Sequence, residues 1–149
     1  MPDEPGPQGQ PGPNQYVGFN ALYGNINVAP AICQAASTHP CDAGNHVKDL
    51  DGNVITDAYG QPGFPNIFNP TATQSLGYAA TMLEAGVQVV YAYIADAHDN
   101  RNGPGTFGPG EAGYVAALKS YDTAFGQFFT RLSKDGIDKS NTLLSLIHI

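Results

Sequence analysis

The sequence predicts an α/β fold that contains a parallel βαβ unit and begins with a loop-rich part. Residues 87–94 are apolar or aromatic at every position except Gln88, which is typical of a parallel strand covered on both faces. The spacing predicts a helix over 111–135, and a second apolar run follows at 143–149. Because strand, helix and strand follow one another, we expect two parallel strands joined by a right-handed crossover.

The amino-terminal half of the chain is predicted to be rich in loops. Of the 18 glycines and 12 prolines, 18 residues lie within positions 1–65. Residues 1–16 predict an extended, disordered arm, because their Gly-Pro triplets are too few for a triple helix. Residues 17–69 predict loops with at most one short strand and a hairpin, and residues 70–149 should hold the αβαβ core.

The charge and hydropathy of the chain exclude several classes of partner. The net charge of −7 argues against nucleic acid as a partner and provides no basic patch for anionic membranes. No apolar run reaches the roughly 18 residues that a membrane span requires. Small ligands and cations remain compatible with the composition.

Cys33 and Cys41 are the two cysteines of the chain, and both lie in loop-like sequence. A disulfide between them would contribute roughly 2–3 kcal/mol in the chain-entropy model and would suit an oxidising compartment. Free thiols or a metal site are the alternatives.

Residues 46–59 predict a β-hairpin, because Asp51-Gly52 lies between two short runs with β character. The oxygen-bearing side chains of this stretch also suggest a calcium loop. The spacing fails the EF-hand pattern, since Val54 replaces the turn glycine and Gly60 replaces the bidentate glutamate. We therefore favour the hairpin over the calcium loop. The side chains in question are Asp49, Asp51, Asn53 and Asp57.

Two helices are predicted in the carboxyl-terminal half. The first follows Asn69 as the N-cap and Pro70 as the first helical residue, and it ends at Gly86. The second ends at Gly136. Each has an apolar stripe that predicts core packing: Leu76, Ala79, Ala80 and Leu83 in the first, and Tyr114, Leu118, Tyr121, Phe125, Phe128 and Leu132 in the second.

Polar residues follow the first predicted strand directly. Asp96 and His98 are two positions apart, so on an extended segment their side chains would point the same way. A carboxylate and an imidazole suit Zn or Mn, which makes these residues candidate metal ligands. The alternative is an Asp that caps a turn beside a hydrogen-bonded His. Gly103-Pro104-Gly105-Thr106-Phe107-Gly108 fits G-x-G-x-x-G, but it comes too late after the strand for a dinucleotide site.

Four segments appear in an order that is found in a known superfamily. They are Glu-Ala-Gly-Val-Gln-Val-Val-Tyr-Ala-Tyr-Ile-Ala-Asp-Ala-His-Asp at 84–99, the Gly-Pro loop after it, the helix from 111 to 132, and Asp-Gly-Ile-Asp-Lys-Ser-Asn-Thr-Leu at 135–143. Together they resemble bacterial phosphoesterases of the alkaline phosphatase superfamily. The resemblance implies an α/β/α sandwich that cleaves small phosphate esters at a two-metal site, with Asp96 and His98 as ligands and Zn or Mn as the metals.

The chain also departs from this superfamily. Nothing before Gly60 resembles the strand that carries the first ligands and the Ser or Thr nucleophile, and a later Asp and His pair is absent. Residues 144–149 resemble translated sequencing-adapter read-through, so His148 is not a candidate.

We expect an incomplete piece of a periplasmic or secreted phosphoesterase, without catalytic residues of its own, that neither binds metal tightly nor hydrolyses substrate. The alternative is a small secreted, non-catalytic binding module that uses its acids for calcium. The oligomeric state stays open.

Overall fold

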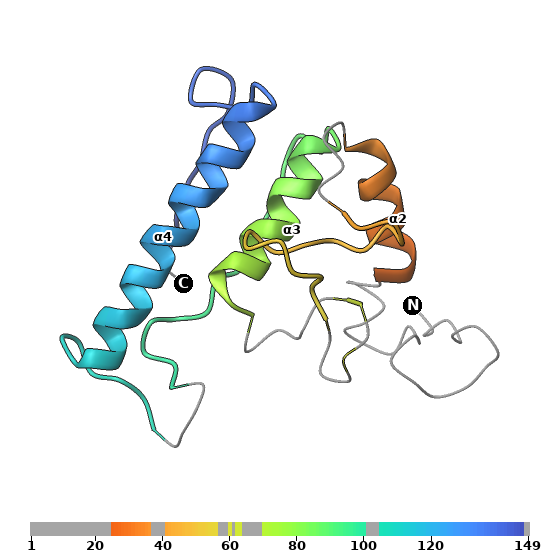
Figure 1. The fold of residues 1–149 in the computed structure, drawn as a ribbon. Coiled ribbons are helices and arrows are strands. Elements are labelled where there is room, and N and C mark those ends of the chain that lie inside the picture. The colour runs from red at the N-terminus through yellow and green to blue at the C-terminus, as the bar shows by residue number, and fades with distance from the viewer. Residues whose placement is uncertain are drawn as a thin grey trace, which may run out of the picture.

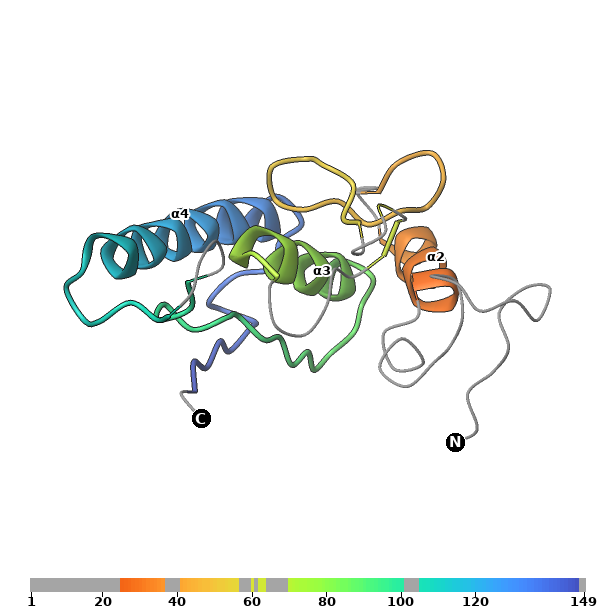
Figure 2. The same cartoon turned by 90° about the horizontal axis from the view of Figure 1, so that it is seen from below.

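The computed structural model describes residues 25–36, 41–56, 60, 62–63, 70–100 and 105–147. These parts contain three helices, α2 (Asn25–Ala35), α3 (Ala72–Glu84) and α4 (Ala112–Lys134). The helices form one layer with α3 in the middle, packed against both neighbours (Figure 1). The segment 41–56 crosses one face of this layer, and the chain after α3 runs along the other face (Figure 2). The predicted arm at 1–16 lies outside the described residues.

The predicted α/β sandwich with a parallel βαβ unit is wrong. The described residues contain only isolated antiparallel bridges, such as Lys48 with Val54, and no sheet. Residues 88–94 and 143–147 both lack backbone hydrogen bonds to any described residue, and the Val87 N–H donates only to the Met82 carbonyl oxygen at the end of α3. The physical reason is that an apolar run predicts burial but says nothing about pairing, whereas a strand needs hydrogen bonds from a neighbour.

Helix α3 begins slightly later than the sequence suggests. Its N-cap is Thr71, whose side chain accepts a hydrogen bond from the Gln74 N–H while the Gln74 side chain accepts one from the Thr71 N–H. This capping box satisfies two groups at the helix start, so Asn69 is not the cap. At the other end Gly86 has φ +86°, the left-handed conformation expected of a stop residue.

Helix α2 lies where loops and a short strand were expected, so that prediction is wrong. Pro30 lies inside the helix and removes one backbone donor, which argues against a helix from sequence alone. The outcome is explained by small apolar residues on one face, which are buried against the segment 41–56 and α3. Cys33 forms the expected disulfide with Cys41. The buried residues of that face are Ala29, Ile32, Cys33 and Ala36.

The main core lies between α3 and α4. Ala80 and Ala124 are completely buried at this contact, and their small side chains let the two helices approach closely. Phe128 and Leu132 of α4 fill the remaining space against Leu76. The predicted stripes of both helices therefore supply this core, although Leu118 near the start of α4 is 47% exposed.

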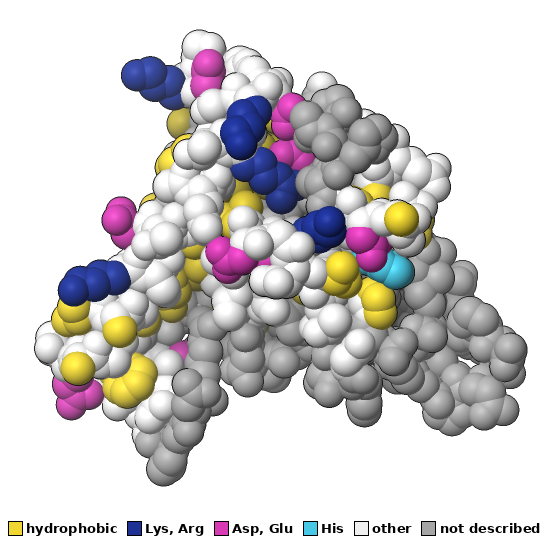
Figure 3. Space-filling view, viewed as in Figure 1, with side chains coloured by type: hydrophobic (Ala, Val, Ile, Leu, Met, Phe, Trp, Pro, Cys, Tyr) yellow, Lys and Arg dark blue, Asp and Glu magenta, His cyan; other side chains and the backbone are white. Residues whose placement is uncertain are grey.

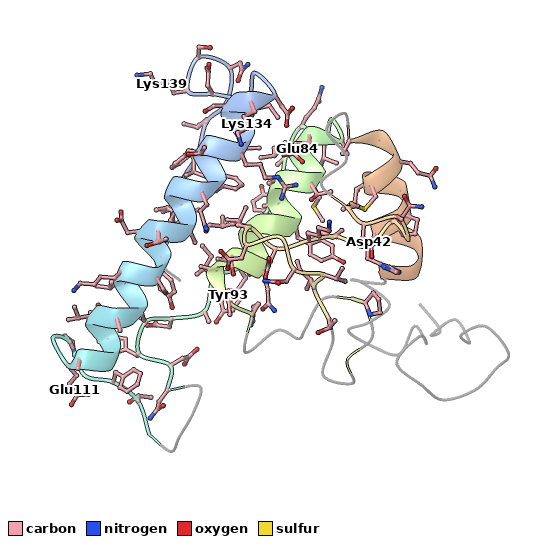
Figure 4. The ribbon with its side chains drawn as sticks, viewed as in Figure 1. Asp42, Glu84, Tyr93, Glu111, Lys134 and Lys139 are labelled. Carbon is pink, nitrogen blue, oxygen red and sulfur yellow. A yellow bond between two sulfur atoms is a disulfide. The ribbon has the colours of Figure 1, made fainter. Side chains whose placement is uncertain are left out.

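A buried ion pair joins the same two helices. Arg131 of α4 donates to both carboxylate oxygens of Glu84, at 2.8 and 2.7 Å, and to the Thr81 hydroxyl at 2.9 Å. The Glu84 side chain is fully buried, and it lies at the carboxyl end of α3 (Figure 4). The bidentate geometry compensates the desolvation of both charges.

The segment predicted as a hairpin reverses direction at Gly52, which has φ +91°. The Asp49 carboxylate accepts hydrogen bonds from the N–H groups of Asp51 and Asn53, so it holds this turn. Residues 57–59 lie outside the described part. The turn packs directly on α3 at Gly77, where an added Cβ would lie 2.7 Å from the Lys48 carbonyl oxygen. Among the described helices, none is long and apolar enough to cross a membrane.

Candidate functional site

The candidate ligands lie on a turn that follows the extended segment. The Asp99 N–H donates to the Asp96 carbonyl oxygen at 3.0 Å, and the Asp96 carboxylate accepts from the His98 N–H at 2.9 Å. The backbone is therefore folded back at 96–99. The expected same-side geometry of Asp96 and His98 required an extended segment, so that expectation is wrong. One oxygen of Asp96 holds the turn, which is the capping arrangement that the sequence left open as an alternative.

His98 is held in a defined orientation by the loop that leads to α4. Its Nδ1 lies 2.6 Å from the Phe107 carbonyl oxygen, and the Phe107 N–H donates to the His98 carbonyl oxygen at 2.8 Å. Because a carbonyl oxygen only accepts, Nδ1 must carry the hydrogen, and in the neutral ring Nε2 keeps its lone pair. Metal-binding histidines commonly show this arrangement, in which one nitrogen is fixed by the backbone and the other faces the metal.

Side chains of helix α4 contact this turn and fix its position. The Tyr121 hydroxyl donates to the Ala95 carbonyl oxygen at 2.6 Å, which fixes the residue just before Asp96. The ring of Tyr114 lies 4.9 Å from that of His98. Phe107 packs so closely on Gly113 that no Cβ would fit there. The amino-terminal half of α4 therefore contacts the turn that carries the candidate ligands and holds it in place.

An open pocket of about 390 Å³ lies beside the turn, between the start of α3 and α4. Its polar lining comes from both helices and from the residues that follow His98, whereas Asp96 and His98 themselves are not among the lining residues. The polar residues are Thr71, Thr73, Asp99, Asn100, Ser120 and Tyr121. Hydroxyl and amide groups of this kind can bind the oxygen atoms of a small polar ligand.

The described residues contain no group of three or more His, Cys, Asp or Glu side chains placed to hold a metal ion. His46, the other histidine within these residues, is paired with Asp42 at 2.9 Å on the loop beside α2 (Figure 4). Hydrogen bonds from the backbone and the side chain of His46 lower the pKa of the Asp42 carboxyl. The predicted ligand set of Asp96 and His98 is thus not extended by a third described residue.

Charged side chains are dispersed over the face of the molecule that Figure 3 draws. Figure 3 shows Lys and Arg side chains among Asp and Glu side chains over one face, without a large patch of either sign.

Two residues of the site were not identified from the sequence. Phe107 acts through its backbone carbonyl, which no side-chain pattern reveals. Tyr121 belongs to the predicted core stripe, and its hydroxyl was not considered. A tyrosine within a stripe of phenylalanine and leucine was an available signal, because a buried hydroxyl needs a hydrogen-bond partner.

Comparison with family models, with curated proteins and with solved structures finds no significant match for this chain.

Proposed function

We propose that the chain is part of a metal-dependent phosphoesterase and supplies two metal ligands, Asp96 and His98. The observation that carries the proposal is the hydrogen bond from His98 Nδ1 to the Phe107 carbonyl oxygen, which leaves Nε2 as the ligand atom. The resemblance of residues 83–143 to the alkaline phosphatase superfamily supports the same assignment. The proposal concerns the site alone, because the sandwich fold that the resemblance implied is absent from the described residues.

The donor atoms match the chemistry of the proposed metal. A carboxylate oxygen and an imidazole nitrogen suit Zn or Mn, and such ions polarise a phosphoryl oxygen and lower the pKa of water. The residues of this chain would hold the ion and, through the adjoining hydroxyl-lined pocket, orient a small phosphate ester. Two ligands leave most of a metal's coordination open, so we expect weak binding and no turnover by this chain.

Calorimetric titration of the purified chain with Zn²⁺ tests the proposal. We expect weak binding that is lost in Asp96→Asn and in His98→Gln. His46→Gln is the matched control, because this histidine is paired with Asp42 and lies outside the proposed site. Binding that disappears in the control and persists in the two site variants would contradict the proposal.

Hydrolysis of 4-nitrophenyl phosphate provides a second readout. We expect none by the chain with added Zn²⁺ or Mn²⁺. Turnover that a chelator abolishes would show that the chain holds a complete site, contrary to the two-ligand assignment.

A non-catalytic binding module is the second candidate. The disulfide between Cys33 and Cys41 favours it, because small secreted modules commonly rely on such cross-links. The acidic residues at 49–53 are poor ligands for calcium, since the Asp49 carboxylate already accepts the hydrogen bonds that hold the turn. Heat of binding in a calorimetric titration with Ca²⁺, together with none in the titration with Zn²⁺, would favour this candidate.

A further inference from the structure

The pocket between the start of α3 and α4 contains a carboxylate without a hydrogen-bond partner in the described part of the chain. Asp99 lines this pocket and is half-buried, and its side chain accepts no hydrogen bond from a described residue. Removing a carboxylate from water costs free energy unless a donor replaces the water, so Asp99 points to a ligand that donates hydrogen bonds. The metal proposal uses Asp96 and His98 and leaves Asp99 without a role.

The same pocket offers further acceptors as well as donors. The Ser120 hydroxyl donates to the Ala117 carbonyl oxygen at 2.7 Å, so its lone pairs can accept from a ligand. The hydroxyls of Thr71 and Thr73 bond each other at 2.9 Å, so one of their two hydrogens remains to be donated. The N–H groups of Ala72 and Thr73 are the first two of α3, and neither has a partner among the described residues.

The charges around the pocket argue against an ionic ligand of either sign. The Asp99 carboxylate repels a phosphate group, and no Lys or Arg is among the described residues that line the pocket. The start of α3 carries the positive end of the helix dipole, which disfavours a cation. A neutral ligand whose groups both donate and accept satisfies the two sides of the pocket, and a hydroxyl group does both.

We propose that this pocket binds a neutral polyol of the size of one sugar ring. The hydroxyls of the ring would donate to Asp99 and Ser120 and accept from the start of α3. The apolar part of the lining, Phe107 with Ala116 and Ala117, would contact the C–H groups of the ring. The volume of about 390 Å³ lies at the small end of ligand pockets, which suits a single ring.

The consequence for the substrate rests on the proposed function. Asp99 directly follows His98, so a polyol in the pocket lies next to the residues that would hold the metal. The phosphate ester would then be a sugar phosphate or a similar polyol phosphate, whose alcohol part occupies the pocket and whose phosphoryl group lies outside it. Binding of the free sugar requires no metal, so the pocket and the metal site can be tested separately.

Titration of the full chain with D-glucose and with D-ribose, followed in ¹H–¹⁵N spectra without metal, tests the proposal. We expect at least one sugar to shift the amide signals of Thr73, Asn100 and Ser120. The dissociation constant should be on the order of millimolar, because a neutral ligand in an open pocket competes with water. It should rise roughly tenfold or more in Asp99→Ala, which removes a hydrogen bond to a charged group. Inorganic phosphate and choline, the charged probes, should leave these signals in place.

A second variant fills the pocket without touching its polar groups. Ala116 is exposed on α4 and lines the pocket, so Ala116→Leu should abolish the shifts and leave the core intact. Asp122→Ala and Ala112→Leu are matched controls, since both residues are exposed on α4 and neither is among the described lining residues, and both should retain binding.

Three outcomes would overturn the proposal: no shift with either sugar, shifts that persist in both pocket variants, or shifts with phosphate or choline alone. Loss of sugar binding in a chain that still binds Zn²⁺ would contradict the pocket assignment alone. Sugar binding without Zn²⁺ binding would contradict the metal assignment alone.

Discussion

At the scale of single residues, Gly77 on α3 and Gly126 on α4 differ in whether the surrounding structure leaves room for a side chain. An added Cβ at Gly77 would lie 2.7 Å from the Lys48 carbonyl oxygen and 2.8 Å from the Asp49 Cα, both backbone atoms of a packed turn. At Gly126 on α4 an added Cβ meets nothing within 4 Å. The same substitution therefore tests a steric contact at one position and helix propensity alone at the other.

We expect Gly77→Ala to lower the free energy of unfolding by about 1–3 kcal/mol, because the turn must shift away from α3. Gly126→Ala should raise it by about 0.5–1 kcal/mol through the lower entropy of the unfolded chain. Urea denaturation of both variants measures the two changes. Equal effects at the two positions would show that the turn at 48–49 does not rest on α3.

Tyr78 gives the molecule a limit of stability at alkaline pH. Burial raises the pKa of Tyr78 to about 12 from the ordinary value of 10.0. The folded state therefore keeps this proton over a range in which the unfolded chain has lost it. Stability is complete below pH 10 and decreases by roughly 2–3 kcal/mol as the pH rises to 12.

We expect Tyr78→Phe to remove this part of the alkaline decrease, because phenylalanine has no proton to lose. The measurement is the slope of unfolding free energy against pH between 10 and 12, compared with that of the parent chain. The slope is compared rather than the stability at one pH, since Tyr78 also makes a further interaction in the fold that the substitution would change. An unchanged slope would place the cause of the decrease elsewhere.

At the scale of elements, the contact between α3 and α4 depends on the pair of Arg131 and Glu84. Arg131→Met should lower the free energy of unfolding by about 3–5 kcal/mol, because it leaves the buried carboxylate unpaired. The double variant Arg131→Met with Glu84→Leu should recover most of that loss, since it removes the orphaned charge. Thermal unfolding of the single and double variants checks this, and a double variant as unstable as the single one would contradict it.

The helices show how far local sequence signals extend. Both carboxyl-terminal helices were predicted from apolar spacing and glycine stops, which act within a few residues of the positions they mark. The N-cap was misplaced because Asn69 and Thr71 both qualify by residue type, and only the partner Gln74 distinguishes them. Helix α2 was missed because Pro30 argued against a helix more strongly than the spacing of small apolar residues argued for one. Those residues stabilise the helix only through their packing against α3 and through the disulfide, which lie elsewhere in the sequence.

At the scale of the whole molecule, the sheet could not be inferred from its predicted strands. Apolar density in 87–94 indicated burial on two faces, yet six of these eight residues are exposed and only Val90 and Ile94 are half-buried. Pairing depends on residues far apart in sequence, and neither 88–94 nor 143–147 has a backbone hydrogen bond to another described segment. The candidate site was predicted as two residues, whereas the loop and helix that hold His98 emerge only in three dimensions.

The assignment of His98 as a ligand is tested most directly by the position of its ring proton. A long-range ¹H–¹⁵N spectrum of the neutral imidazoles should show hydrogen on Nδ1 of His98 and none on Nε2, as the 2.6 Å contact with Phe107 requires. Added Zn²⁺ should then shift the Nε2 resonance of His98 and leave His46 unchanged. Hydrogen on Nε2 of His98, or a Zn²⁺ shift confined to His46, would contradict the account.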